Sequence, residues 1–304
     1  LMTQEVVDTF QLSMNGKKVI APLHVGFAYT KPLAVVGNIL DKENGYLTLL
    51  STATRRPIDI VEISCPGARD AMFNMDDSKI FTTCQQEPKG MAVIDVEARK
   101  EIKMVPIKGG RAGGMDPQGK YFMVSASKSV HFFDSQTAEL VKTIKVPGGG
   151  GNFTCLKDGS KCYVGLRKAN AVGVIDMAKL ELMKTIETGP DANRLYLNPG
   201  NSRYGLFANE AGKSDIVSII DTQLDVKVKD IWTGLGPHNV AFDPDGKFAV
   251  ISTKKENVAT LVDTGSADPN DWDVITTDLD SGIQNNGVRW VPSPAALKKA
   301  LAQN

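Results

Sequence analysis

One short phrase, an apolar pair closed by an aspartate, returns throughout this 304-residue chain. The copies read VVDT at 6–9, AVIDV at 92–96, HFFDS at 131–135, GVIDM at 173–177, SIIDT at 218–222 and TLVDT at 260–264. With Ser51 of YLTLLSTAT in the one missing slot, the closing residues are spaced 39 to 45 residues apart. A period of this length is typical of repeat architectures, and it constrains the fold more than any other feature of the sequence.

A second phrase recurs in fixed phase with the first. It reads NMDDSK at 74–79, DPQGK at 116–120, LKDGSK at 156–161, NPGNSR at 198–203 and DPDGK at 243–247. Pro, Asp, Asn and Gly are the residues of tight turns, and each copy precedes a β-rich run. Each unit therefore predicts a strand, a hairpin turn, a second strand, a loop, a third strand that ends in the aspartate, a short turn and a fourth strand. We expect the aspartate to start that last turn by accepting hydrogen bonds from backbone N–H groups.

Four-stranded units of this length, repeated seven times, predict an all-β, seven-bladed β-propeller with four-stranded antiparallel blades. One such sheet cannot bury both of its faces, whereas seven packed side by side can. We expect a single domain over residues 1–304. The first aspartate copy comes too early for a whole blade, and NNGVRWVPSP at 285–294 aligns with the first strand of a unit at 238–245. The last blade is therefore expected to be closed by residues 1–23 together with 285–304, although the tail from 294 has a helical composition.

The balance of charge bears on which partners the chain could attract. Lys and Arg total 35, as do Asp and Glu, so the formal net charge is zero. Nothing in this balance favours nucleic acid or an anionic membrane surface as a partner. No apolar run approaches the roughly 18 residues that span a bilayer, so we expect no membrane insertion.

The sequence offers little for catalysis. There are three histidines, no CxxC, no GxSxG and no HExxH, and the glycine-rich run at 145–153 is expected to be a connector between blades. Carboxylates do not cluster with a histidine, so a metal-dependent lactonase-type enzyme is the least favoured alternative. We expect no catalytic residues and no metal site on this chain alone.

The four cysteines suggest two disulfides. Cys155 and Cys162 flank the LKDGSK hairpin, so they would lie opposite each other on adjacent strands. Cys65 ends a fourth strand and Cys84 ends the second strand of the next unit, which places both at the same side of neighbouring blades. The alternative for each pair is two buried thiols. An even count without metal-binding spacing favours an oxidising, extracytoplasmic compartment.

The strands ending in VID, the SPDGK-like hairpins and the Gly-Pro loops together resemble the YVTN-type seven-bladed β-propellers. The likeness is clearest in GPDANRLYLNPGNSR at 189–203 and GPHNVAFDPDGK at 236–247, and it extends over almost the whole chain. That group includes the haem-binding propeller of cytochrome-type nitrite reductases, the amine-dehydrogenase propeller chains and the propeller subunit of hydrazine synthase, an extracytoplasmic multi-haem complex.

The resemblance implies a non-catalytic scaffold or binding subunit in an extracytoplasmic, periplasmic or equivalent, haem-containing redox complex. Its partners would be other protein subunits, including multi-haem ones, and the chain itself would carry no cofactor. The alternative that the resemblance implies is a propeller that itself binds a haem-type tetrapyrrole.

Aligning the units on their hairpins places a set of polar residues at the starts of the first strands, which in propellers of this kind open on the central channel. The candidate channel or ligand-binding residues are His24, Arg69, Arg111, Asn193, Arg194, His238 and Asn286. Arginine, histidine and asparagine side chains with few carboxylates suit an anion, such as the propionates of a haem or an acidic side chain of a partner. The alternative is a set of polar residues that only bond water and backbone.

One enlarged turn, DTGSADPNDWDVITTD at 263–278, contains Trp272 among acidic residues. An exposed aromatic side chain there would be a candidate partner-binding residue. The alternative is that Trp272 fills a local gap in the packing.

Overall fold

The computed structural model describes residues 9–17, 19, 22–39, 42–210, 212, 214–256 and 258–280. Asn286 and most of the segments expected to close the last blade lie outside the described residues, so that closure stays a prediction. The described chain forms two compact units, Phe10–Thr185 and the residues from Ile186 onward.

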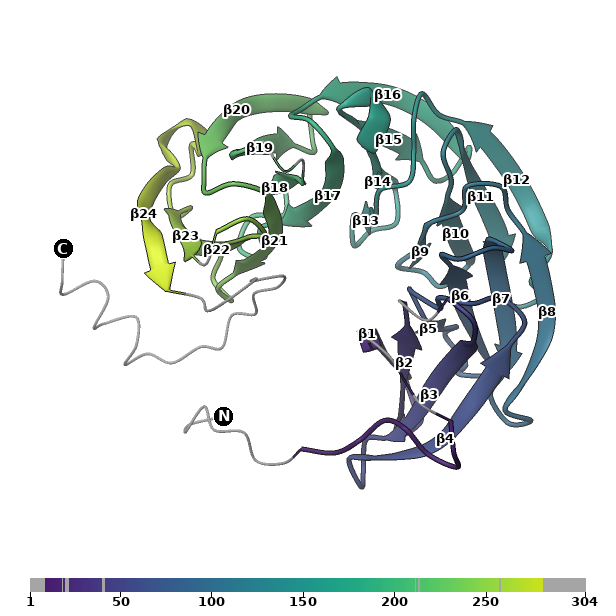
Figure 1. Ribbon diagram of the computed structural model, residues 1–304. Helices are drawn as coiled ribbons and strands as arrows, with labels where there is room; N and C mark the ends of the chain where they lie inside the picture. Colours follow the sequence, from purple (N-terminus) through teal and green to yellow (C-terminus); the bar gives the residue numbers. More distant parts are fainter. Residues whose placement is uncertain are drawn as a thin grey trace. The chain divides into compact units, whose positions relative to one another are not determined.

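The described residues form six four-stranded antiparallel sheets, and in each sheet the strands are neighbours in chain order (Figure 1). Sheets 1 and 2 contain β1 (Pro22–Phe27), β2 (Leu33–Asn38), β3 (Gly45–Ser51), β4 (Arg56–Ile63), β5 (Met72–Phe73), β6 (Lys79–Cys84), β7 (Gly90–Asp95) and β8 (Lys100–Pro106). Sheets 3 and 4 contain β9 (Ala112–Met115), β10 (Tyr121–Ser125), β11 (Ser129–Asp134), β12 (Leu140–Lys145), β13 (Phe153–Cys155), β14 (Lys161–Leu166), β15 (Ala171–Asp176) and β16 (Glu181–Glu187). Sheets 5 and 6 contain β17 (Ala192–Leu197), β18 (Tyr204–Asn209), β19 (Ile216–Asp221), β20 (Val226–Trp232), β21 (Pro237–Phe242), β22 (Phe248–Thr253), β23 (Val258–Asp263) and β24 (Asp273–Asp280).

Two short 3-10 helices lie in connections between strands. They are η1 (Arg167–Ala169), between β14 and β15, and η2 (Pro269–Asp271), between β23 and β24. Within the described ranges, no helix has the length and apolar character needed to cross a membrane. The prediction of four-stranded antiparallel sheets in an all-β chain is confirmed by the described residues.

The repeated aspartate starts the turn between the third and fourth strands, as predicted. In sheet 3, Asp134 Oδ1 accepts hydrogen bonds from the backbone N–H groups of Gln136 and Thr137, both at 2.8 Å. The same kind of bond is made by Asp95, Asp176, Asp221 and Asp263, and by the hydroxyl of Ser51 in sheet 1. The fourth residue after each of Ser51, Asp95, Asp134, Asp176 and Asp221 has a positive φ, between 51 and 59°. These residues are Arg55, Arg99, Ala138, Leu180 and Asp225. One side chain thus fixes the geometry of each turn, which explains why it recurs.

Neighbouring sheets within a unit bury their faces against each other. Phe81 of β6 and Phe122 of β10 stack with their ring centroids 5.1 Å apart, which joins sheets 2 and 3. Similar buried clusters join sheets 1 and 2, sheets 3 and 4, and sheets 5 and 6. Because each buried large apolar side chain contributes about 1.5–3 kcal/mol, the sheets depend on their neighbours for stability.

Asp77 joins the first two sheets by a polar contact. It occupies the turn position that glycine holds in three other hairpins, has a φ of 55°, and is fully buried. Its carboxylate accepts bonds from the backbone N–H groups of Tyr29, Thr30 and Lys31 at 2.7–3.0 Å, and from the Thr30 hydroxyl. Burial alone would raise the pKa of Asp77, but these donors stabilise the charged form and hold the pKa below its usual value.

We expect Asp77→Asn to lower the free energy of unfolding by about 3 kcal/mol at neutral pH, because an amide presents N–H groups to buried donors. Since the folded-state pKa of Asp77 is lowered, its contribution is complete above about pH 4 and is lost as the pH falls through the folded value. The difference between wild type and variant in urea denaturation should therefore shrink below about pH 4.

Asp76→Asn in the same turn is the matched control. Asp76 is exposed and accepts its backbone bond from Ser78, so this variant should lose about 1 kcal/mol or less. Equal losses from the two variants would contradict the role assigned to Asp77.

Candidate functional site

A buried ion pair lies just before β5, at the start of the first strand of sheet 2. Arg69 is 7% exposed and Asp70 is 4% exposed, and Arg69 Nε lies 3.5 Å from Asp70 Oδ2. A charged pair is costly to bury unless further hydrogen bonds satisfy it. The surroundings of Asp70 supply such bonds to the carboxylate.

Asp70 connects three sheets of the first unit. From sheet 1, His24 Nδ1 lies 2.6 Å from Asp70 Oδ1, and from sheet 3 the backbone N–H of Gly113 donates to Oδ2 at 3.0 Å. Burial alone would raise the pKa of Asp70, but Arg69, His24 and Gly113 together hold it below its usual value. Asp70 is therefore ionised at neutral pH.

His24 is presented by an irregularity in β1. The pairing with β2 shifts register between Leu23 and Val25, and His24 has a φ of 56° at that bulge. Its side chain is 42% exposed, and its Nδ1 is held by Asp70. In the described part of the chain, its other ring nitrogen, Nε2, makes no hydrogen bond. A carboxylate on one ring nitrogen fixes the direction of the other, as it does for histidines that bind metals.

Two arginines converge on the loop before β13. Arg69 Nη2 donates to Asn152 Oδ1 at 3.2 Å, and Arg111 Nη1 donates to the carbonyl of Gly150 at 2.8 Å. Asn152 belongs to a match for the glycosylation sequon, but its side chain is engaged by Arg69. The first unit thus brings His24, Arg69 and Arg111 into one connected cluster.

The glycine run in this loop is a connector between sheets 3 and 4, as predicted. The N–H groups of Gly149, Gly150 and Gly151 each donate to protein oxygen atoms at 2.8–3.0 Å. A side chain on Gly149 would lie 2.3 Å from the carbonyl oxygen of Ala126, and Gly150 has a φ of 95°. Close packing explains the glycines, and their N–H groups are not available to a phosphate.

The second unit contains a different cluster, centred on Glu210. The side chain of Glu210 is 5% exposed, and its Oε1 accepts bonds from His238 Nε2 at 2.9 Å and from Asn193 Nδ2. Lys254 Nζ lies 3.5 Å from Oε2. This carboxylate therefore collects three donors from sheets 5 and 6.

Hydrogen bonds continue from His238 to Tyr196. Asn239 Nδ2 lies 3.0 Å from His238 Nδ1, and the Tyr196 hydroxyl donates to Asn239 Oδ1 at 2.5 Å. The guanidinium of Arg194 lies 5.3 Å from the centre of the Tyr196 ring. Both ring nitrogens of His238 therefore have protein partners, in contrast to His24.

Buried carboxylates hold together the polar side chains at the starts of the first strands. Each unit organises its polar side chains around one buried carboxylate, Asp70 or Glu210. Asp70 adjoins a candidate in the sequence, but Glu210 follows β18, and only the folded chain brings it beside His238. A sequence alignment of first strands contains no signal for such a residue.

Trp272 is not an exposed partner anchor. It is 1% exposed, its Nε1 donates to the carbonyl of Ser266 at 2.9 Å, and its ring packs edge-on against Tyr204 with centroids 6.0 Å apart. The enlarged turn folds back and supplies enough apolar surface to bury the indole. The interpretation of Trp272 as a packing residue therefore holds.

A different tryptophan is exposed. Trp232 ends the outer strand β20 and is 69% exposed. The outer strands of sheets 2, 3 and 4 end instead in Pro106, Lys145 and Glu187. A tryptophan at the end of an outer strand was the sequence signal that could have identified it.

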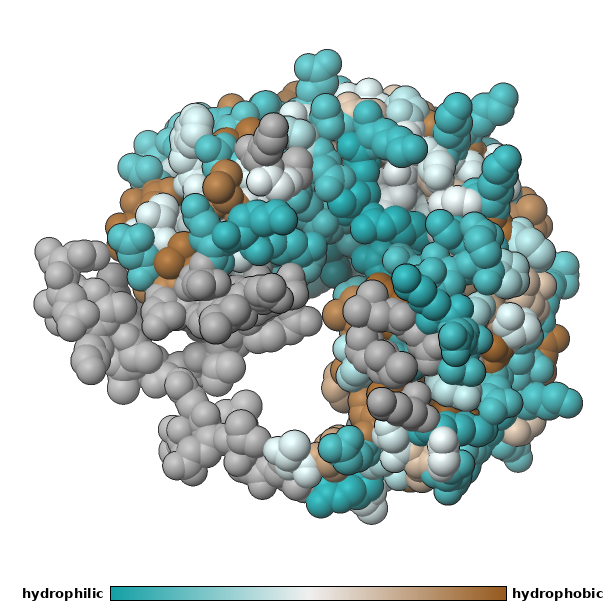
Figure 2. Space-filling view, in the orientation of Figure 1, coloured by the Kyte–Doolittle hydropathy of each residue, from teal (hydrophilic) through white to brown (hydrophobic). Residues whose placement is uncertain are grey.

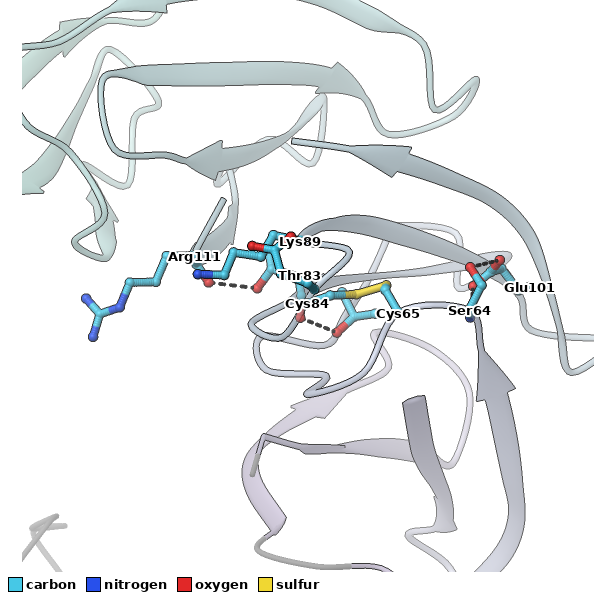
Figure 3. The surroundings of a disulfide bond; sticks show 9 residues. Ser64, Cys65, Thr83, Cys84, Lys89, Glu101 and Arg111 are labelled. Atoms are coloured by element: carbon cyan, nitrogen blue, oxygen red, sulfur yellow. Dashed lines mark hydrogen bonds between the residues drawn. A yellow bond between two sulfur atoms is a disulfide. The ribbon is translucent and has the colours of Figure 1, made fainter. Parts of the chain in front are cut away.

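The structure joins the cysteines in the two pairs considered from the sequence, Cys65–Cys84 and Cys155–Cys162. The first pair links the end of sheet 1 to β6 (Figure 3), and the second links β13 to β14. Among the described residues, no three His, Cys, Asp or Glu side chains converge so that they could hold a metal ion.

Comparison with known proteins shows the fold of this chain. No protein-family model matches it, and no curated protein matches its sequence. A chain of Kuenenia stuttgartiensis hydrazine synthase is similar in structure, with 16% identity and a TM-score of 0.67 over 92% of this chain and 93% of that one. The β-propeller domain of Cps50 (Swd1) from Myceliophteria thermophila is 13% identical, with a TM-score of 0.66 over 90% of each chain. A functionally unknown protein from Desulfotomaculum acetoxidans DSM 771 is 13% identical, with a TM-score of 0.61 over 78% of each chain.

The chain therefore has a β-propeller fold, of which the described residues contribute six four-stranded sheets. At these identities the likeness extends to fold alone. The number of seven blades and the YVTN type stay predictions.

We expect Asp70→Asn to lower the free energy of unfolding by about 3 kcal/mol, because it leaves the buried Arg69 guanidinium without its carboxylate. Asp59→Asn is the control, since the Asp59–Arg99 pair is exposed and its atoms lie 3.4 Å apart. Loss of that surface pair should change the stability by less than about 1 kcal/mol. Urea denaturation at neutral pH measures both, and a loss from Asp70→Asn as small as that from Asp59→Asn would contradict the buried pair.

Proposed function

We propose that this chain is a non-catalytic β-propeller subunit that binds other protein subunits within an extracytoplasmic, haem-containing redox complex. The observation that carries the proposal is the exposed side chain of Trp232. Tryptophan is a large apolar residue, and in protein interfaces it is among the residues that contribute most binding energy.

The surroundings of Trp232 suit a contact with another protein. Leu235, three residues further on, is 37% exposed, so an aromatic and an aliphatic side chain stand close together in the sequence at the end of β20. On the face that Figure 2 presents, hydrophilic residues predominate and hydrophobic residues form small separate patches. A partner that covers the Trp232 indole, which is 69% exposed, would remove apolar surface from water, and this favours association.

Two further observations support the kind of assembly. The two disulfides suit an oxidising compartment, since thiols in the cytosol are kept reduced. The likeness to a hydrazine synthase chain covers 92% of this chain and 93% of that chain, so the shared fold accounts for nearly all of both. A chain made almost wholly of a propeller suits a subunit that presents binding surfaces.

We expect Trp232→Ala to weaken assembly at least tenfold, because truncating a central interface tryptophan costs about 2 kcal/mol or more. The tagged chain is purified from its native host, and the complex is measured by size-exclusion chromatography with light scattering and by stoichiometric subunit analysis. Wild type should elute with haem-containing subunits in a fixed ratio.

Leu140→Ala is the matched control, because Leu140 is 54% exposed on an outer strand of the other unit. It should leave the complex intact. A wild-type chain that elutes alone, or a Trp232→Ala chain that assembles as well as wild type, would contradict the proposal.

A second candidate function is the binding of a haem-type tetrapyrrole by the propeller itself. His24 favours it, since Asp70 orients its ring and its Nε2 faces away from that bond. His238 is poorly suited to be an iron ligand, because Glu210 and Asn239 already contact its two ring nitrogens.

This candidate predicts a Soret band in the chain purified from its native host. His24→Ala should abolish the band, whereas His131→Ala should leave it unchanged, because both ring nitrogens of His131 bond to hydroxyl groups of its own sheet. A colourless wild-type chain, or a band that survives His24→Ala, would exclude His24 as the ligand.

A further inference from the structure

Arg69 is incompletely satisfied. Its Nη2 donates to Asn152, whereas its Nε and Nη1 are buried and make no hydrogen bond within the described part of the chain. The nearest carboxylate, Asp70, lies 3.5 Å from Nε and is shared with His24 and Gly113. Buried polar groups are nearly always bonded, and an unsatisfied charged donor is costlier than a neutral one. These guanidinium N–H groups therefore call for an acceptor that the described residues do not provide.

The backbone positions of Arg69 and Arg111 are held by the strand that ends in Cys84. The N–H of Arg69 donates to the carbonyl of Thr83 at 2.8 Å. The carbonyl of Arg111 accepts from Thr83 Oγ1 at 3.1 Å and from Gln85 Nε2 at 3.3 Å. The residues on both sides of Cys84 therefore fix both arginines.

The Cys65–Cys84 disulfide secures this arrangement. Both cysteines are fully buried, and the bond joins positions separated by 19 in the sequence, with Arg69 between them. Figure 3 shows the hydrogen bond between Thr83 and Arg111 beside the disulfide, with the Arg111 side chain extending away from it. The side chain of Arg111 is half-buried, so it forms the accessible side of the pair.

The far ends of the two side chains meet the same short loop. Arg69 reaches Asn152 and Arg111 reaches Gly150, and a Cβ on Gly150 would have the Arg111 side chain as its nearest neighbour, 3.7 Å from Cδ. Guanidinium groups hold carboxylate, sulfate and phosphate through pairs of N–H groups, which a single charge on lysine does not reproduce.

We propose that Arg69 and Arg111 together bind one oxyanion group, a carboxylate, sulfate or phosphate, and that the Cys65–Cys84 disulfide holds the two arginines in place for it. The site lies wholly within the first unit. It does not depend on partner binding through Trp232, which belongs to the second.

The test is isothermal titration calorimetry on the purified full chain with sodium sulfate and, separately, sodium acetate, at constant ionic strength. We expect a single site for at least one of the two anions. The order of their affinities distinguishes a free inorganic oxyanion from the carboxylate of an organic molecule.

Variants separate this site from general attraction of anions. Arg69→Gln and Arg111→Gln should each weaken binding at least about tenfold, the equivalent of one lost charge-assisted bond. Lys108→Gln, three residues before Arg111 and exposed, should leave affinity within about twofold of wild type. Because Arg111 is only half-buried, Arg111→Gln tests the site even where Arg69→Gln fails to fold.

The disulfide is tested with a matched pair of double variants. Cys65→Ser with Cys84→Ser should weaken binding several-fold, whereas Cys155→Ser with Cys162→Ser should leave it unchanged. The site is overturned if wild type binds neither sulfate nor acetate up to about 10 mM. It is also overturned if Arg111→Gln binds the anion as tightly as wild type. Equal binding by both cysteine variants overturns the role of the disulfide.

Discussion

A four-stranded antiparallel sheet has two faces, and in this protein the apolar side chains of one sheet are buried by the next. Phe81 and Phe122 belong to different sheets and stack in one core, and the other buried clusters also cross from sheet to sheet. Because the contribution of apolar burial is roughly proportional to area, an isolated sheet would lose much of its stability. The fold therefore requires repetition of the four-stranded sheet. The turn that each aspartate starts has the same geometry from one sheet to the next.

Packing of sheet on sheet also explains where the polar clusters form. The starts of the first strands of sheets 1, 2 and 3 approach closely enough for one carboxylate, Asp70, to contact all three. A buried ion pair contributes little net stability, since desolvation offsets much of its attraction. In the observed register Asp70 has partners from three sheets, and the same register brings Arg69 and Arg111 to one loop.

The sequence predicted what depends on short-range chemistry. The hairpins, the aspartate-capped turns and the equivalence of Ser51 to an aspartate all follow from a few neighbouring residues, and the structure contains them. Glu210 could not be predicted as a partner of His238, because the two are joined only by packing between sheets. The environment of Trp272 depended on how an enlarged turn folds back, and the sequence left both outcomes open.

The register of the repeated units is tested most directly by mapping the disulfides. Digestion of the non-reduced protein, followed by mass spectrometry, identifies which cysteine-containing peptides are linked. The account predicts one link from Cys65 to Cys84, between neighbouring sheets, and one from Cys155 to Cys162, across a single hairpin. A link from Cys65 or Cys84 to Cys155 or Cys162 would contradict it, because residues of sheets 1 and 2 would then lie against sheet 4.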